Sequence, residues 1–147
     1  PPWFENISKR QVKAPKIFIR DSGLLHALLQ LSILSDLQSH PKLGAAWEGF
    51  ALEQVIGLFN TRDAYYWGTY SGAELDLMIH FSGQRYGFEF KYSDAPGISR
   101  SMRIAMQDLS LDHLWVVYPG RQAYPLDEHI SVIPLTSIDQ LASKDPL

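Results

Sequence analysis

Apolar and polar residues alternate along much of two neighbouring stretches of the chain, residues 73–81 and 84–92. Such alternation is typical of a β-strand that turns one face to a core and the other to a more polar surface. Ser82 and Gly83 separate the two stretches and form a two-residue link of the kind that closes a hairpin. The pattern therefore predicts an antiparallel pair of strands.

Residues 43–60 show a helical pattern instead. With successive residues placed about 100° apart, as in an α-helix, their apolar positions fall on one side. The apolar stripe consists of Gly44, Ala51, Leu52, Val55 and Phe59. Glu48 lies in the middle of this stripe, where its burial is costly unless the carboxylate meets a polar or cationic group. The pattern predicts a long amphipathic helix with one glutamate that hydrophobic packing alone does not explain.

Four further segments complete the central part of the chain. The aromatic-rich residues 64–70 predict a strand, and residues 98–109 predict a helix after a turn. Residues 113–119 form a continuous apolar run, which is typical of a strand buried on both faces in parallel pairing. Residues 129–135 predict a last short strand, which Pro134 places at a sheet edge or brings to its end. This order predicts an α/β fold with a mixed sheet between helices.

The first part of the chain has a different character. Residues 1–16 combine three prolines with four basic side chains, which indicates a solvated lead-in, and a short strand and a helix are expected to follow. We therefore divide the chain into a lead-in with a short helix, 1–42, and a folded domain, 43–147. Because the sequence begins with Pro1-Pro2, we expect it to be a piece of a longer protein.

Composition narrows the functional classes. The chain has 147 residues and a net charge of -3, so any nucleic-acid binding would depend on a local basic patch. It has no cysteine, which excludes disulfides and thiolate chemistry and favours a cytoplasmic location. No apolar run reaches the roughly 20 residues that span a bilayer, so we expect no membrane contact. No glycine-rich phosphate-binding loop is visible, so we expect no nucleotide triphosphate to bind by that route.

The two-residue link also predicts which residues face each other across the hairpin. It sets Asp76 opposite Glu89, and Glu74 opposite Lys91. The other face then pairs Leu75 with Phe90, Leu77 with Phe88 and Ile79 with Tyr86. If the long helix packs on the polar face, Glu48 joins the first pair.

Directly opposed side chains in antiparallel strands have Cβ atoms about 4.5–5.5 Å apart, so two carboxylates placed in this way repel each other. A divalent cation, a shared proton or a nearby cation such as Lys91 relieves the repulsion. A solvated polar face is the structural alternative, in which Glu74 and Lys91 form an ordinary surface pair. On the late helix, Arg100, Arg103 and Gln107 are candidates for contact with a phosphate backbone, with a solvated face as the alternative.

The sequence resembles a known family in several segments at once. A glutamate on a helix, then Asp76, then the triplet Glu89-Phe90-Lys91 resembles the PD-(D/E)xK motif of restriction-endonuclease-like nucleases. The whole chain also resembles the C-terminal domain of unknown function attached to many prokaryotic AAA-type ATPases. The matching segments are PKIFIRDSGLLHALL, LGAAWEGFALEQVI, YYWGTYSGAELDLMI and GFEFKYS. The resemblance implies a restriction-endonuclease-like core in residues 43–147, with the order helix, three strands, helix and strand.

The resemblance also implies roles for individual residues. Asp76 and Glu89, with the backbone carbonyl of Phe90, would ligate Mg²⁺ or Mn²⁺, and Glu48 would complete the metal site. Lys91 would position the attacking water or stabilise the charge that develops on the phosphate. Glu74 is a further residue that the family motif carries beside its aspartate. Leu75 stands where the motif has its proline.

Two functions from different classes follow from these features. The first is a metal-dependent nuclease domain that acts on DNA and works with an ATPase part of the same longer protein. The second is a non-catalytic module that binds nucleic acid or protein for that ATPase. Assembly into a homo-oligomer is a further, purely structural possibility.

Overall fold

The computed structural model describes residues 1–3, 23, 27, 38 and 40–142. The strand and the helix expected in the lead-in fall outside these residues. Within the described part, six strands form one mixed sheet in the order β1-β2-β3-β4-β6-β5. The strands are β1 (Ala64–Gly68), β2 (Glu74–Phe81), β3 (Gln84–Phe90), β4 (His113–Tyr118), β5 (Tyr124–Asp127) and β6 (Ile130–Pro134).

The pairing of the strands confirms the expected α/β fold with a mixed sheet. Strands β1, β2 and β3 form an antiparallel meander, whereas β4 is parallel to both of its neighbours, β3 and β6. Pro134 is the last residue of β6, which lies inside the sheet, so the proline marks a strand end. The sequence pattern missed β5, because its four residues, YPLD, are short, contain a proline and lie at the sheet edge.

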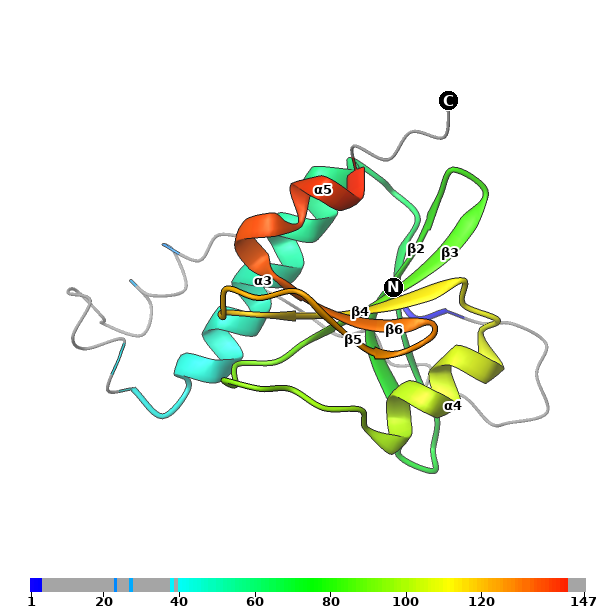
Figure 1. The fold of residues 1–147 in the computed structure, drawn as a ribbon, viewed down its shortest axis with the longest axis horizontal. Coiled ribbons are helices and arrows are strands. Elements are labelled where there is room, and N and C mark those ends of the chain that lie inside the picture. Colours follow the sequence, from blue (N-terminus) through cyan, green and yellow to red (C-terminus); the bar gives the residue numbers. More distant parts are fainter. Residues whose placement is uncertain (4–22, 24–26, 28–37, 39, 143–147) are drawn as a thin grey trace.

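Helices cover both faces of the sheet (Figure 1). Helix α3 (Leu43–Phe59) covers one face together with the short helices η1 (Leu135–Ser137) and α5 (Asp139–Ala142), and α4 (Arg100–Asp108) covers the other. The predicted stripe of α3 is buried at Ala51, Leu52, Val55 and Phe59, and Gly44 is half-buried. Ser99 caps α4 by accepting a hydrogen bond from the Met102 amide.

The hairpin between β2 and β3 has the register that the sequence predicts. The paired residues run from Phe81↔Gln84 to Leu77↔Phe88. The paired stretch does not extend to Glu74 and Lys91: Glu74 pairs with Gly68 of β1, and the Lys91 amide donates to the Val117 carbonyl beside β4. The expected opposition of Glu74 and Lys91 is therefore wrong in its backbone register.

One predicted position on the apolar face is also wrong. Leu77 and Phe88 pack on the α3 side, but Leu75 packs in the core on the α4 side. The cause is a bulge in β2, where Asp76 and Leu77 together oppose the single residue Tyr66 of β1. An extra residue reverses the alternation, so Leu75 does not share a face with Phe90.

Candidate active site

Asp76 lies in the bulge of β2, one residue beyond the last backbone pair with β3. Its Oδ2 accepts a hydrogen bond from the backbone amide of Phe90 at 3.2 Å. In a regular ladder that amide would donate to a strand carbonyl. The carboxylate of Asp76 therefore bridges the two strands at the point where they separate, which fixes its position beside Glu89.

Glu89 lies in the middle of the sheet, paired with Val116 of β4, and only 3% of its surface is exposed. Its Oε2 lies 3.1 Å from the Nζ of Lys91. Its Oε1 is buried and has no hydrogen-bond partner within the described part of the chain. A buried carboxylate oxygen without a partner is unusual and costly, so this atom indicates a role beyond packing.

Glu48 reaches the same place from α3. Its Oε1 accepts a hydrogen bond from the backbone amide of Tyr92 at 3.5 Å, just after the end of β3. The rings of Trp47 and Tyr92, whose centroids are 5.8 Å apart, hold the first half of α3 against this part of the chain. Helix α3 packs on the face of Leu77 and Phe88 and not on the polar face of the hairpin, and Glu48 meets its polar partner just beyond the end of β3.

The charges of these side chains act on one another. Burial and the nearby Asp76 carboxylate raise the pKa of Glu89 to about 8, although Lys91 lowers it. Burial by itself lowers the pKa of Lys91, but the charges of Glu89, Asp76 and Glu48 outweigh this effect and raise it. Around neutral pH, Lys91 is therefore charged and Glu89 holds a proton in the absence of any added cation.

The donors at this site fit a small divalent cation. Mg²⁺ prefers oxygen ligands and is often held by only one or two carboxylates, with water in its other positions. The partnerless Oε1 of Glu89 and the adjacent carboxylate of Asp76 meet that requirement. Among the described residues, no group of three or more histidine, aspartate or glutamate side chains is arranged to hold a metal ion.

The remaining candidates from the sequence lie at the start of β2 and on α4. Glu74 is exposed at the start of β2. Arg100, Arg103 and Gln107 are exposed on α4. Arg103 forms an exposed ion pair with Asp127 at 3.3 Å. The structure brings Glu48, Asp76, Glu89 and Lys91 together, and it leaves the three α4 side chains on another element.

A cleft of about 440 Å³ opens beside Asp76, between α3 and β1. Arg62, which is exposed, and Tyr65, which is half-buried, line it together with Asp76. No sequence pattern indicated Arg62, because the cleft that it lines forms only where α3 and β1 meet.

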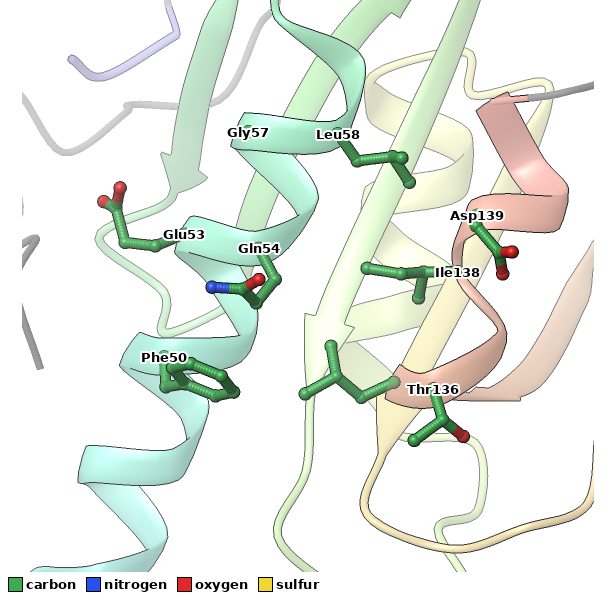
Figure 2. Close-up of a pocket in the computed structure, with 9 residues that line it drawn as sticks. Phe50, Glu53, Gln54, Gly57, Leu58, Thr136, Ile138 and Asp139 are labelled. Atoms are coloured by element: carbon green, nitrogen blue, oxygen red, sulfur yellow. The ribbon is translucent and has the colours of Figure 1, made fainter.

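A second groove, of about 610 Å³, is lined by none of Glu48, Asp76 and Glu89. It runs between α3 and the segment that follows β6 (Figure 2). Phe50, Gln54 and Leu58 extend from α3, and Ile138 faces them from the opposite wall. This groove is largely apolar and contains none of the four converging side chains, so it is not the candidate active site.

Comparison with known proteins places the chain in a family. The profile of the family described as Domain of unknown function (DUF4143) matches residues 43–138, and the profile of Domain of unknown function (DUF8612) matches residues 1–35. The chain is 50% identical over 146 residues to an uncharacterized protein of Mycobacterium tuberculosis and, equally, to one of Mycobacterium bovis. No solved structure matches the chain significantly.

The chain belongs to the DUF4143 family, whose profile covers most of it. The match to the two mycobacterial proteins covers 99% of this chain but 33% of each relative, so the chain spans about a third of their length. In the described residues, no helix has the length and apolar character needed to cross a membrane.

Proposed function

We propose that this member of the DUF4143 family is a metal-dependent nuclease domain of the PD-(D/E)xK type that hydrolyses phosphodiester bonds of DNA. One observation carries the proposal: Glu48, Asp76, Glu89 and Lys91, from three different elements, converge at the end of β3. A buried glutamate with a partnerless oxygen, a raised pKa and a lysine 3.1 Å away is poorly explained as a solvated surface.

The proposal assigns a role to each of these groups. Asp76 and Glu89 would hold the metal ion together with the Phe90 carbonyl, and Glu48 would complete the site. Asp76 is already oriented by the Phe90 amide, and Glu89 by Lys91. Lys91 remains protonated and supplies positive charge where negative charge develops on the phosphate. When bound, Mg²⁺ or Mn²⁺ polarises the phosphodiester and lowers the pKa of the attacking water.

The cleft beside Asp76 supports a nucleic-acid substrate. Arg62 offers a cation for a phosphate, and Tyr65 offers a ring on which a base can stack. A second, separate candidate contact with the phosphates of a longer DNA duplex lies on α4, at Arg100, Arg103 and Gln107. Because the chain spans about a third of its relatives' length, we also propose that an ATPase part of a longer protein drives or regulates the domain.

Calorimetry with Mn²⁺ and Mg²⁺, followed by cleavage assays on single- and double-stranded DNA, tests the proposal. We expect metal binding that is lost in Asp76→Ala and metal-dependent cleavage that is lost in Asp76→Ala and Lys91→Met. Proton release on metal binding is expected at pH 7, because Glu89 must give up its proton. Glu128→Gln, an exposed glutamate between β5 and β6, is the matched control. Absence of metal binding, or cleavage that persists in Asp76→Ala, would contradict the proposal.

A second candidate function is a non-catalytic interaction module. It is favoured because Lys91 and a proton already offset much of the negative charge of the site, and because the described residues form no three-ligand metal cluster. Phe50 and Tyr92 are also exposed aromatic side chains that a partner can cover. This function predicts that DNA or protein binding survives in Asp76→Ala and Lys91→Met but weakens in Phe50→Ala, as measured by gel shift or pull-down.

A further inference from the structure

A separate hollow of about 250 Å³ lies where β3 and β4 begin, on the α3 side of the sheet. Three aromatic side chains line it: Phe59 at the end of α3, Tyr86 on β3 and Trp115 on β4. Tyr86 and Trp115 are only half-buried although they lie on the two central strands of the sheet. The rings of Tyr86 and Trp115 are therefore accessible to a ligand in the hollow.

Neighbouring side chains contact two of the rings that line this hollow, Tyr86 and Trp115. The Tyr86 hydroxyl donates to Oε1 of Gln84, which also lines the hollow. The ring of His113 lies 4.3 Å from that of Trp115, centroid to centroid, and its Nε2 is hydrogen-bonded to Ser131 Oγ at 3.1 Å. These contacts restrict the rings of Tyr86 and Trp115 before any ligand arrives, which lowers the entropic cost of binding.

The charge at the mouth of the hollow is negative. Asp112 is exposed there, and its Oδ2 accepts a hydrogen bond from the Arg85 amide at 2.7 Å. The pKa of Tyr86 is raised, first by the burial of its hydroxyl group and second by the negative charge of Asp112. The carboxylate of Asp112 is therefore close enough to influence this aromatic side chain. The guanidinium of Arg85 is engaged elsewhere: its Nη1 donates to the Leu109 carbonyl at 2.9 Å, and it lies over the ring of Trp3. Neither lysine nor arginine lines the hollow in the described part of the chain.

We propose that this hollow binds a small organic cation, a quaternary or fully methylated ammonium group, between Phe59, Tyr86 and Trp115 with Asp112 as its counter-charge. Aromatic ring faces carry negative potential and attract such cations, which are weakly hydrated and fill an apolar cage. The volume is below that of a typical drug-sized site, which suits a ligand as small as choline. The inference does not depend on the proposed nuclease function, because none of its residues belongs to the carboxylate site.

Titration of the chain with choline and with its neutral isostere 3,3-dimethylbutan-1-ol separates charge recognition from simple apolar filling. Binding is followed by tryptophan fluorescence and by calorimetry, with sodium chloride added to match ionic strength. We expect saturable binding of choline and binding of the neutral isostere that is at least about tenfold weaker. No saturable binding of choline, or equal binding of both compounds, would overturn the proposal.

Two variants locate the site. Asp112→Asn keeps the acceptor for the Arg85 amide but removes the charge, and we expect choline to bind about three- to tenfold more weakly. Trp115→Leu removes an aromatic wall and is expected to abolish the fluorescence response. Unchanged choline affinity in Asp112→Asn contradicts the proposal even if Trp115→Leu fails to fold. Asp94→Asn, at an exposed aspartate that does not line the hollow, is the matched control and is expected to leave choline binding unchanged.

Discussion

The Nζ of Lys91 lies 3.1 Å from Oε2 of Glu89, while the other oxygen of the same carboxyl group is buried without a hydrogen-bond partner in the described part of the chain. The lysine thus satisfies one side of the carboxyl group only. Glu89 lies near the end of β3 and Lys91 directly follows that strand, and both are affected by the charge of Asp76. The predictions that follow concern the cost of this arrangement to the fold and the packing of β3 beside it.

The raised pKa of Glu89 predicts that the protein loses stability as the pH rises. Between the usual pKa of 4.5 and the folded value of about 8, the folded state keeps a proton that the unfolded state has lost. The free energy of unfolding therefore falls with a slope that approaches about 1.4 kcal/mol per pH unit and then levels off above pH 8. Urea unfolding from pH 4.5 to 9, with a chelator present, measures this slope.

Glu89→Gln is the matched variant for this measurement, because it has nearly the same shape and no titrating proton. We expect its pH slope in this window to be much smaller than that of the wild type. Its stability relative to the wild type should improve as the pH rises. Equal slopes in the two proteins would show that the pKa of Glu89 is not raised.

Replacement of Lys91 by methionine tests the cation that balances the carboxylates. Methionine keeps much of the apolar stem but leaves Glu48, Asp76 and Glu89 without their positive neighbour. We expect a loss of about 1–2 kcal/mol at pH 8, a modest value because the Lys91 side chain is 43% exposed. Lys91→Arg keeps the charge and should recover most of the loss, and the difference between the two variants should shrink at pH 5.

Asp76 has a structural role that can be separated from any metal. Its Oδ2 accepts the Phe90 amide, so Asp76→Ala should leave that amide without its partner and cost about 1–3 kcal/mol. Asp76→Asn retains an acceptor and should cost less. Hydrogen exchange at the Phe90 amide is expected to be faster in Asp76→Ala than in Asp76→Asn, and similar rates in the two variants would contradict this role.

Gly87 provides a test of packing beneath the site. A Cβ at this position would lie 2.6 Å from Cδ1 of Leu111 and 3.3 Å from Cδ2 of Leu75. We expect Gly87→Ala to destabilise the protein by about 1–3 kcal/mol in thermal or urea unfolding. Gly57→Ala is the control on α3, where a Cβ meets no atom within 4 Å, and it should be stabilising by up to about 1 kcal/mol.

Much of the fold could be predicted from local patterns. The two-residue link at Ser82-Gly83 and the alternation on either side fixed the hairpin register from Phe81↔Gln84 to Leu77↔Phe88. The 100° spacing identified the buried side of α3. Strand β5 was not predicted, because an edge strand of four residues carries no periodic signal.

The candidate site was predictable only in part. Periodicity and the resemblance selected Glu48, Asp76, Glu89 and Lys91, which the structure brings together. Sequence patterns also selected Arg100 and its neighbours on α4, which lie on another element. They overlooked Arg62 and the aromatic hollow, because these features depend on elements that meet only in three dimensions.

The sequence by itself determined most of the elements and the pairing of β2 with β3, because alternation, helical spacing and a tight turn act between residues close in the chain. Only the tertiary structure decided the bulge at Asp76, the move of Leu75 to the α4 side and the contact of Glu48 with the Tyr92 amide. A bulge is set by the register of a second partner strand, here β1, and the contact is set by how α3 lies across the sheet. Such long-range arrangements minimise the free energy of the whole domain, and no local stretch of sequence encodes them.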